Sequence, residues 1–240
     1  GVGKTFLRKV SSTGEELWVK ELDSSSPSNY YSAVYQSLAV CDEGVALSAE
    51  HQRKVEMLDA NGNSRWLHDY SDELPPAKEL TQGPAVAQVV ADSACNVAVS
   101  FRYGRESTGS TIRLDRYTPQ GTIAWTQSLN LDFTASAWSK PVLDLLPDDG
   151  LVIIYGSQAD SHHFHHFDGA GNVVAEGSLN DRYGGIVFAD HERIVTLAYS
   201  DAQERMESFD LSGALQWSHP LDSSIAGSPS ALCSLPVGSN

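Results

Sequence analysis

The sequence predicts an all-β protein, a five-bladed β-propeller made of four-stranded antiparallel blades. Three observations lead to this prediction. One segment recurs five times along the 240 residues, and each copy turns at a glycine. A second pair of apolar, strand-like stretches precedes four of these copies. The chain shows no stretch with the apolar spacing of an amphipathic helix, so the repeats follow one another as sheets.

The five copies align without a gap on the turn glycine, at Gly14, Gly62, Gly121, Gly171 and Gly213. Four residues after the glycine, four copies carry a tryptophan, and the fourth copy carries Ala175 instead: Trp18, Trp66, Trp125 and Trp217. Tryptophan is one of the rarest residue types, so its return at one offset indicates an internal repeat.

Each copy predicts a β-hairpin, because its turn glycine, part of an Asn-Gly, Gln-Gly or Ser-Gly dipeptide in three copies, supplies a positive φ between two apolar strands. A second hairpin is predicted upstream of the last four copies, in the stretches SLAVCDEGVALSAE, VAQVVADSACNVAVSFR, PVLDLLPDDGLVIIYG and IVFADHERIVTLAYS. Two hairpins make one four-stranded sheet, called a blade below. The repeated tryptophan is expected to lie as a wedge between successive blades.

These boundaries predict a single propeller domain over residues 1–240. Residues 1–22 give the outer hairpin of a shared first blade, and 222–240 give a closing strand. The complete blades are expected at about 23–70, 71–129, 130–179 and 180–221. Residues 229–237 would then pair in the same sheet as residues 4–22, because closure removes exposed sheet edges. The alternative is that the chain is part of a larger ring, cut on both sides.

The motif Asp-x-x-Gly-x-x-x-Trp, seen as DANGNSRW and DLSGALQW, resembles the blade repeat of PQQ-like propellers. That superfamily includes quinoprotein alcohol dehydrogenases and the propeller lipoprotein of the bacterial outer-membrane assembly machinery. The resemblance covers all five repeats but reaches only the structural motif. The motif departs at Ser11 and Thr118, which take the Asp position, and at Ala175. The vicinal cysteines and calcium-binding acids that a quinoprotein would need have no matching positions, so no cofactor is expected.

Composition excludes some partners. With 16 basic against 31 acidic residues and a net charge of −15, the chain lacks the clustered Lys and Arg that nucleic acids require. No apolar run is long enough to span a membrane. Cys41, Cys95 and Cys233 form no vicinal or CxxC pair, which predicts free or half-buried thiols. The resemblance implies an extracytoplasmic bacterial protein, periplasmic or secreted.

A run of histidines in SHHFHHFD could bind a metal, because His163 and His165 share one face of an extended strand. The repeat offers a simpler explanation. The position six residues before the turn glycine, which His165 takes, is polar in every other copy: Arg8, Glu56, Asp115 and Glu207. We therefore predict no metal, with His163 and His165 as weak candidates only.

Enzymatic functions find little support. A five-bladed glycoside hydrolase needs two carboxylates flanking one bond, and the predicted inner strands offer only Asp144. The amino-terminal GVGKTF ends like a phosphate-binding loop but lacks its first glycine and its preceding strand. No catalytic residues are predicted, and whether the chain is an enzyme is left open with an inclination against it.

The loops between predicted blades carry Tyr30, Tyr31, Trp138 and Tyr183 among small polar residues. Propeller topology gathers such loops on one face, and exposed aromatic rings there suit contacts with protein or carbohydrate. The alternative is that these rings plug the channel and pack the blade tops. The favoured function is a non-enzymatic binding or scaffolding propeller with a protein partner. A carbohydrate-binding, lectin-like propeller is second, and a five-bladed glycoside hydrolase is third.

Overall fold

The computed structural model describes residues 5–22, 35–49, 53–73, 82–105, 109–131, 141–146, 148–155, 162–179, 182–189, 193–200 and 203–221. These residues form strands and turns, and none of them lies in a helix. They divide into two compact units, residues 1–135 and 136–240, and each unit is described by itself.

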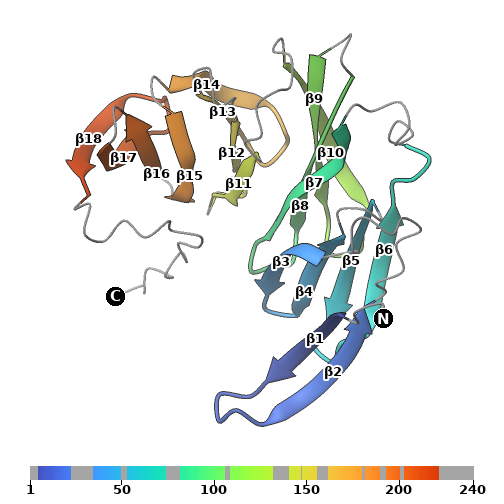
Figure 1. The fold of residues 1–240 in the computed structure, drawn as a ribbon. Helices are drawn as coiled ribbons and strands as arrows, with labels where there is room; N and C mark the ends of the chain where they lie inside the picture. The colour runs from blue at the N-terminus through green and yellow to red at the C-terminus, as the bar shows by residue number, and fades with distance from the viewer. Residues whose placement is uncertain are drawn as a thin grey trace. The chain divides into compact units, whose positions relative to one another are not determined.

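The first unit contains one two-stranded and two four-stranded antiparallel sheets (Figure 1). The two-stranded sheet is the hairpin of β1 (Thr5–Val10) and β2 (Glu16–Leu22). The second sheet follows chain order: β3 (Tyr35–Cys41), β4 (Gly44–Ala49), β5 (Lys54–Asp59) and β6 (Ser64–Asp69). The third does the same: β7 (Gln82–Ala91), β8 (Val97–Arg105), β9 (Gly109–Tyr117) and β10 (Ile123–Leu131).

The second unit holds two further four-stranded sheets, also paired in chain order. One contains β11 (Val142–Leu145), β12 (Leu151–Tyr155), β13 (His162–Phe167) and β14 (Val173–Leu179). The other contains β15 (Arg182–Ala189), β16 (Arg193–Ser200), β17 (Gln203–Asp210) and β18 (Leu215–Pro220). The prediction that two successive hairpins merge into one blade is thus confirmed for these four sheets. The predicted closing strand, residues 229–237, lies outside the described residues.

The five repeat turns share one backbone geometry. Their glycines all have positive φ, between +81° and +86°. In each turn the same two hydrogen bonds close the chain. At Gly62, for example, its N–H donates to the Asp59 carbonyl at 3.0 Å, and the Asp59 N–H donates to the Asn63 carbonyl at 2.8 Å. Side chains with a Cβ are disfavoured at such φ values, which explains why glycine recurs.

The aspartate of the repeat motif holds the turn. Asp59 Oδ1 accepts hydrogen bonds from the N–H groups of Asn61 (2.8 Å) and Asn63 (2.9 Å). Asp168 and Asp210 do the same in their own turns. The two departures from the motif keep this function, because Ser11 Oγ and Thr118 Oγ1 accept from the N–H four residues on, at 3.0 and 3.3 Å. A short side-chain acceptor, rather than a carboxylate, is what the turn requires.

Apolar side chains pack on both faces of the blades. All five residues of β12 are buried. In the first unit, Cys41, Met57, Val89 and Val97 belong to one core between the second and third blades. A smaller core lies under the first hairpin, where Leu7 packs against Leu22 and three residues of the second blade, Val45, Leu47 and Leu58. Packing on both faces explains why the repeats carry apolar residues at even and odd offsets alike.

The prediction of free thiols is wrong for two of the three cysteines. Cys41 and Cys95 form a disulfide with their sulfurs 2.06 Å apart, although 54 residues separate them in sequence. The pairing follows from blade stacking. It brings the β3–β4 turn against the β7–β8 turn, where the Asp42 N–H donates to the Ser93 carbonyl at 3.4 Å. Cysteine spacing cannot reveal contacts between turns of different sheets. Cys233 lies outside the described residues.

Candidate functional site

Three of the four predicted interaction residues lie outside the part of the chain that the structure describes. Tyr30, Tyr31 and Trp138 lie outside the described residues. Tyr183 lies on β15, where the backbone is described but its side chain is not. A shared face for these four residues therefore remains a prediction.

Two of the repeated tryptophans lie on the turn of the following blade, as predicted. Trp18 Nε1 donates to the Ala60 carbonyl at 2.9 Å, and Trp66 Nε1 donates to the Pro119 carbonyl at 3.2 Å. Each indole covers the repeat glycine of that turn: a Cβ on Gly62 would stand 3.0 Å from Trp18 Cδ2. Trp125 is half-buried. Trp217 is 39% exposed, which makes it the most exposed of the four tryptophans.

The fourth repeat, which lacks the tryptophan, uses a different ring. Phe164 on β13 is 1% exposed, and its Cε1 overlaps the position that a Cβ on Gly213 would take. The same atom would lie 2.7 Å from a Cβ on Gly177, on the neighbouring strand β14. Phe164 thus covers the next repeat glycine from another position in the repeat, which compensates for Ala175.

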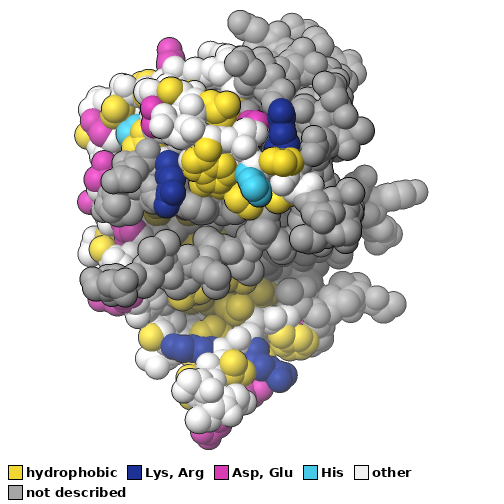
Figure 2. All heavy atoms as spheres, turned by 90° about the vertical axis from the view of Figure 1, so that its left-hand side faces the viewer, with side chains coloured by type: hydrophobic (Ala, Val, Ile, Leu, Met, Phe, Trp, Pro, Cys, Tyr) yellow, Lys and Arg dark blue, Asp and Glu magenta, His cyan; other side chains and the backbone are white. Residues whose placement is uncertain are grey.

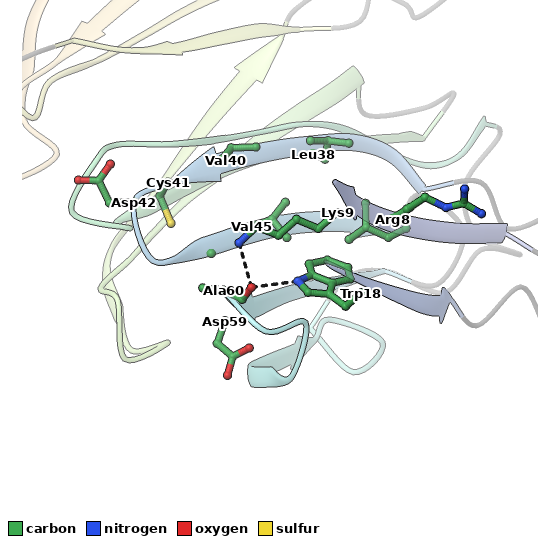
Figure 3. A pocket seen from close by; sticks show the side chains of 12 residues that line it. Arg8, Lys9, Trp18, Leu38, Val40, Cys41, Asp42, Val45, Asp59 and Ala60 are labelled. Carbon is green, nitrogen blue, oxygen red and sulfur yellow. Dashed lines mark hydrogen bonds between the residues drawn. The ribbon is translucent and has the colours of Figure 1, made fainter. Parts of the chain in front are cut away.

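Beside Trp18, a groove of about 290 Å³ opens between the first hairpin and strand β3 of the second blade (Figure 3). From β1 it is lined by Leu7, Arg8 and Lys9, and from β3 by Leu38 and Val40. At the end of the groove next to Ala60, two side chains donate hydrogen bonds to the Ala60 carbonyl: Lys9 Nζ at 3.0 Å and Trp18 Nε1 at 2.9 Å.

The floor of the groove is apolar and open. Leu38 is 56% and Val40 is 70% exposed. Register places both side chains on the same face of the sheet as Val45 and Leu47, because Leu38 pairs with Leu47 and Val40 with Val45. Val45 and Leu47 are buried beneath the first hairpin. One face of the second blade is therefore covered by the first hairpin at Val45 and Leu47 and left open at Leu38 and Val40, where the groove lies.

The basic groups around the groove have partners. Arg8 Nε lies 3.1 Å from Glu16 Oε2, and Lys20 Nζ lies 2.8 Å from Glu56 Oε1. The hydrogen bonds from Asn63 and Asn61 hold the pKa of Asp59 below its usual range, so this carboxylate serves the turn. The groove therefore offers apolar contact, the backbone of β1 and the Asp42 carboxylate.

A polar cluster joins the second and third blades. The hydroxyls of Tyr70 and Tyr117 hydrogen-bond to each other, and both residues are fully buried. Arg113 lies over the Tyr70 ring, 5.2 Å from its centroid, and connects two acids: its Nε is 3.0 Å from Asp115 Oδ2 and its Nη2 is 2.7 Å from Glu73 Oε2. Burial raises the pKa of both tyrosines, which keeps them neutral. Because the tyrosines lie inside a packed interface, this cluster fastens blades together.

The two candidate metal ligands have protein partners. His163 Nδ1 lies 3.0 Å from Ser178 Oγ, and His165 Nε2 lies 3.0 Å from Glu176 Oε2. Tyr155 stacks on both imidazoles. Burial lowers the pKa of His165 and raises that of Tyr155 to about 12. Within the described ranges, no three His, Cys, Asp or Glu side chains are grouped as metal ligands would be.

The position of His165 pairs with the adjacent strand in other blades too. Asp115 Oδ1 accepts from Thr126 Oγ1 at 2.7 Å, and Glu207 Oε1 accepts from Ser218 Oγ at 3.0 Å. These acids occupy the same place in their repeats as His165, six residues before the turn glycine. The interpretation of this position as a polar pairing site in the blade therefore accounts for His165 without a metal.

Comparison with known proteins supports the fold, but it identifies neither a family nor a function. No protein-family model matches the chain, and no curated protein sequence does. Three solved structures resemble it at 10–15% sequence identity and TM-scores of 0.52–0.54: a protein of unknown function from Bacteroides caccae, BamB from Moraxella catarrhalis, and the β-propeller domain of Nup133 from Vanderwaltozyma polyspora.

The matches cover 90%, 89% and 92% of this chain but only 72%, 58% and 66% of those chains. The chain thus spans less than two thirds of the length of two of them. In the described part of the chain, no helix could cross a membrane. The four-stranded blades, the repeated turns and these similarities together give the fold: the chain is built like a β-propeller.

Proposed function

We propose that this chain is a non-enzymatic binding or scaffolding propeller whose partner is a protein. The proposal rests on one observation: the polar clusters of the described residues are used to hold the fold together, whereas large apolar side chains lie exposed at the surface. The polar clusters of the described residues take part in turns and blade contacts, as at Asp59, Arg113 and His165. Large apolar side chains remain exposed, and such surfaces mark interaction sites.

These exposed apolar side chains come from several blades. Those more than half exposed are Phe6 54%, Val10 53%, Leu17 55%, Leu38 56%, Val40 70%, Leu67 55%, Val174 57% and Leu215 54%. Figure 2 shows one face on which hydrophobic side chains lie at the surface among basic, acidic and histidine side chains. This mixture of apolar and charged groups suits a protein surface better than a small polar substrate.

The finer fold is part of the proposal. The five repeat hairpins form one ring of five PQQ-like blades over residues 1–240, and the loops with Tyr30, Tyr31, Trp138 and Tyr183 form its binding face. Rigid aromatic rings among small polar residues give binding energy at low entropic cost. A few such anchors are enough for a stable interface.

We further propose that the protein is extracytoplasmic. The support is the Cys41–Cys95 disulfide, which joins the second and third blades. Structural disulfides form and persist in oxidising compartments, such as the periplasm or the extracellular space, and are rare in the cytosol.

The test uses a photo-crosslinking residue, p-benzoylphenylalanine, placed in the full chain at Tyr31 or Trp138. The control carries it at Thr13, an exposed polar residue of the turn between β1 and β2. After irradiation in the native host, the proposal expects one protein to be captured from the first two positions but not from Thr13. Capture at all three positions alike, or at none, contradicts a protein-binding loop face.

The captured partner is then titrated with purified chain. Tyr31→Ala with Trp138→Ala should weaken binding at least tenfold and leave the melting temperature nearly unchanged. Lost folding with unchanged affinity per folded molecule would mean that these rings pack the blades. A glycan array run on the same protein gives the alternative outcome: binding to sugars with no protein captured would replace the scaffold by a lectin-like propeller.

A further inference from the structure

We propose that the Cys41–Cys95 disulfide is a redox-sensitive clamp between the second and third blades, and that a dithiol reductant opens it while the chain stays folded. Opening the clamp releases the β3–β4 turn from the β7–β8 turn. The other contacts between these two blades remain. The proposal concerns regulation of the blade interface and does not depend on the identity of a protein partner.

The first argument is the backbone at Cys95. Its φ is +65°, in the left-handed region that few residues with a Cβ adopt. Asp149 has the same φ in the β11–β12 turn, and the two turns share a hydrogen bond: Cys95 N–H donates to the Asp92 carbonyl at 3.0 Å, and Asp149 N–H to the Leu146 carbonyl at 3.1 Å. Gly, Asn and Asp suit such a position. The conformation of the turn therefore does not explain a cysteine there, whereas the bond to Cys41 does.

The second argument is how little else joins the two turns. Within the described residues, one hydrogen bond runs between them besides the disulfide, from the Asp42 N–H to the Ser93 carbonyl at 3.4 Å. This distance is beyond the usual range for an N–H to carbonyl bond. When the disulfide is reduced, only this weak hydrogen bond and apolar packing hold the two turns together.

The third argument is that the rest of the interface does not need the disulfide. The Val89 N–H donates to Ser37 Oγ at 3.0 Å, and Trp66 Nε1 donates to the Pro119 carbonyl at 3.2 Å. Met57 and Val89 belong to the apolar core that the two blades share. These contacts lie away from the two turns in sequence and join the same two blades. Reduction therefore opens one end of the interface and leaves the fold in place.

The exposure of the two cysteines sets the order of the reaction. Cys41 lines the groove beside the first hairpin (Figure 3) and is 8% exposed, whereas Cys95 is fully buried. A thiolate of the reductant attacks Cys41 Sγ, a mixed disulfide forms, and Cys95 leaves as a thiolate that takes up a proton. The second thiol of the reductant then loses its proton and attacks the first, and Cys41 leaves and is protonated. The dithiol is oxidised to a disulfide, and two electrons and two protons pass to the cysteines.

Reduction of the full chain with dithiothreitol, without denaturant, tests whether the clamp opens in the folded state. New thiols are trapped by alkylation and assigned to Cys41 and Cys95 by peptide mass spectrometry. The rate should rise in proportion to the dithiothreitol concentration and exceed the rate of global unfolding at least tenfold. That unfolding rate is measured by tryptophan fluorescence in urea and extrapolated to water. No reduction, or a rate that levels off at the unfolding rate, would overturn the inference.

Hydrogen–deuterium exchange of the reduced against the oxidised chain tests what opening does. Residues 41–44 and 92–96 should exchange at least tenfold faster after reduction. The matched control is the β11–β12 turn at Asp149, which has the same φ as Cys95 but contains no cysteine, and its exchange should not change. Strands β5 and β9 should also be unchanged, because the first unit stays folded.

The variant Cys41→Ser with Cys95→Ser separates the bond from the reagent. Without dithiothreitol it should show the fast exchange of the reduced chain in both turns, and dithiothreitol should change nothing further. Unchanged exchange in the two turns after reduction would show that the disulfide is no clamp. Faster exchange in β5 and β9 as well would show that it holds the whole unit together, and either result overturns the inference.

Discussion

The indole of Trp66 lies against Gly121, the turn glycine of the next repeat. A Cβ on Gly121 would stand 2.5 Å from Trp66 Cγ, and Trp66 Nε1 donates to the Pro119 carbonyl in the same turn. Gly121 is therefore required twice, for its φ of +81° and for the space that the indole fills. Trp18 repeats this relationship with Gly62 one blade earlier.

Gly121→Ala and Gly14→Ala separate the two requirements. Both glycines have nearly the same φ, +81° and +85°, but a Cβ on Gly14 would meet nothing within 4 Å. Gly14→Ala should lower the free energy of unfolding by the backbone cost alone, about 1–2 kcal/mol. Gly121→Ala adds an overpacking cost of about 1–3 kcal/mol. Urea denaturation measures both, and equal losses would argue against tight indole contact.

Phe164→Ala should be costly, because this ring fills the place of the tryptophan missing from the fourth repeat. Phe164 is 1% exposed, so the expected loss of unfolding free energy is about 3–5 kcal/mol. Phe6→Ala is the control, since Phe6 is 54% exposed and its loss should stay near 0.5 kcal/mol. A small effect at Phe164 would show that it does not replace the tryptophan.

Thiol titration of the unfolded, unreduced protein should find one free thiol per chain. Of the three cysteines, Cys41 and Cys95 are bonded, which leaves Cys233. Full reduction should release three thiols. Cys41→Ala with Cys95→Ala should then lower the free energy of unfolding by about 2–4 kcal/mol, since the bridge closes a long loop. Three free thiols before reduction would refute the disulfide.

Acid should weaken the repeat turns. Hydrogen bonds within the turns lower the pKa of Asp59, Asp168 and Asp210 in the folded chain. An aspartate whose pKa is lowered by folding stabilises the fold at pH values above the ordinary aspartate pKa of about 3.9. This stabilisation is lost as the pH falls from that value through the folded-state pKa.

Melting temperatures measured from neutral pH down to about pH 2 test this dependence. Asp59→Asn keeps an acceptor oxygen but cannot titrate, so its melting temperature should fall less steeply with acid than that of the unmodified protein. Asp72→Asn removes a carboxylate outside the repeat turns and should leave the slope unchanged. Parallel curves for all three proteins would show that the turn carboxylates do not couple folding to pH.

Much of the fold could be predicted from the sequence because its signals are local. A glycine at positive φ and an acceptor three residues before it act within one hairpin, as at Gly62 and Asp59. The tryptophan four residues after the glycine marks the same hairpin in the sequence, although the indole of Trp66 contacts the next repeat. Alignment of the repeats also anticipated that His165 fills a polar position. The pairing of that position with the next strand, as in Asp115 with Thr126, agrees with it.

What the sequence did not reveal depends on contacts between blades. The bond of Cys41 to Cys95 and the hydroxyl contact of Tyr70 with Tyr117 join residues 54 and 47 positions apart. Their pairing depends on how two sheets stack, which no repeat motif encodes. The groove at Val40 went unnoticed for the same reason, because an apolar residue on a strand gives no sign of whether a neighbouring blade covers it.

A double-mutant cycle on Trp66 and Gly121 tests most directly the central claim, that the first and second repeats are each locked to the next one by an indole on a turn glycine. With Trp66→Ala present, Gly121→Ala should cost no more than Gly14→Ala does, because only the backbone strain remains. The coupling free energy from urea denaturation should then be at least about 1 kcal/mol, within the range for residues in contact. Additive losses, with Gly121→Ala equally costly whether or not the indole is present, would contradict the account.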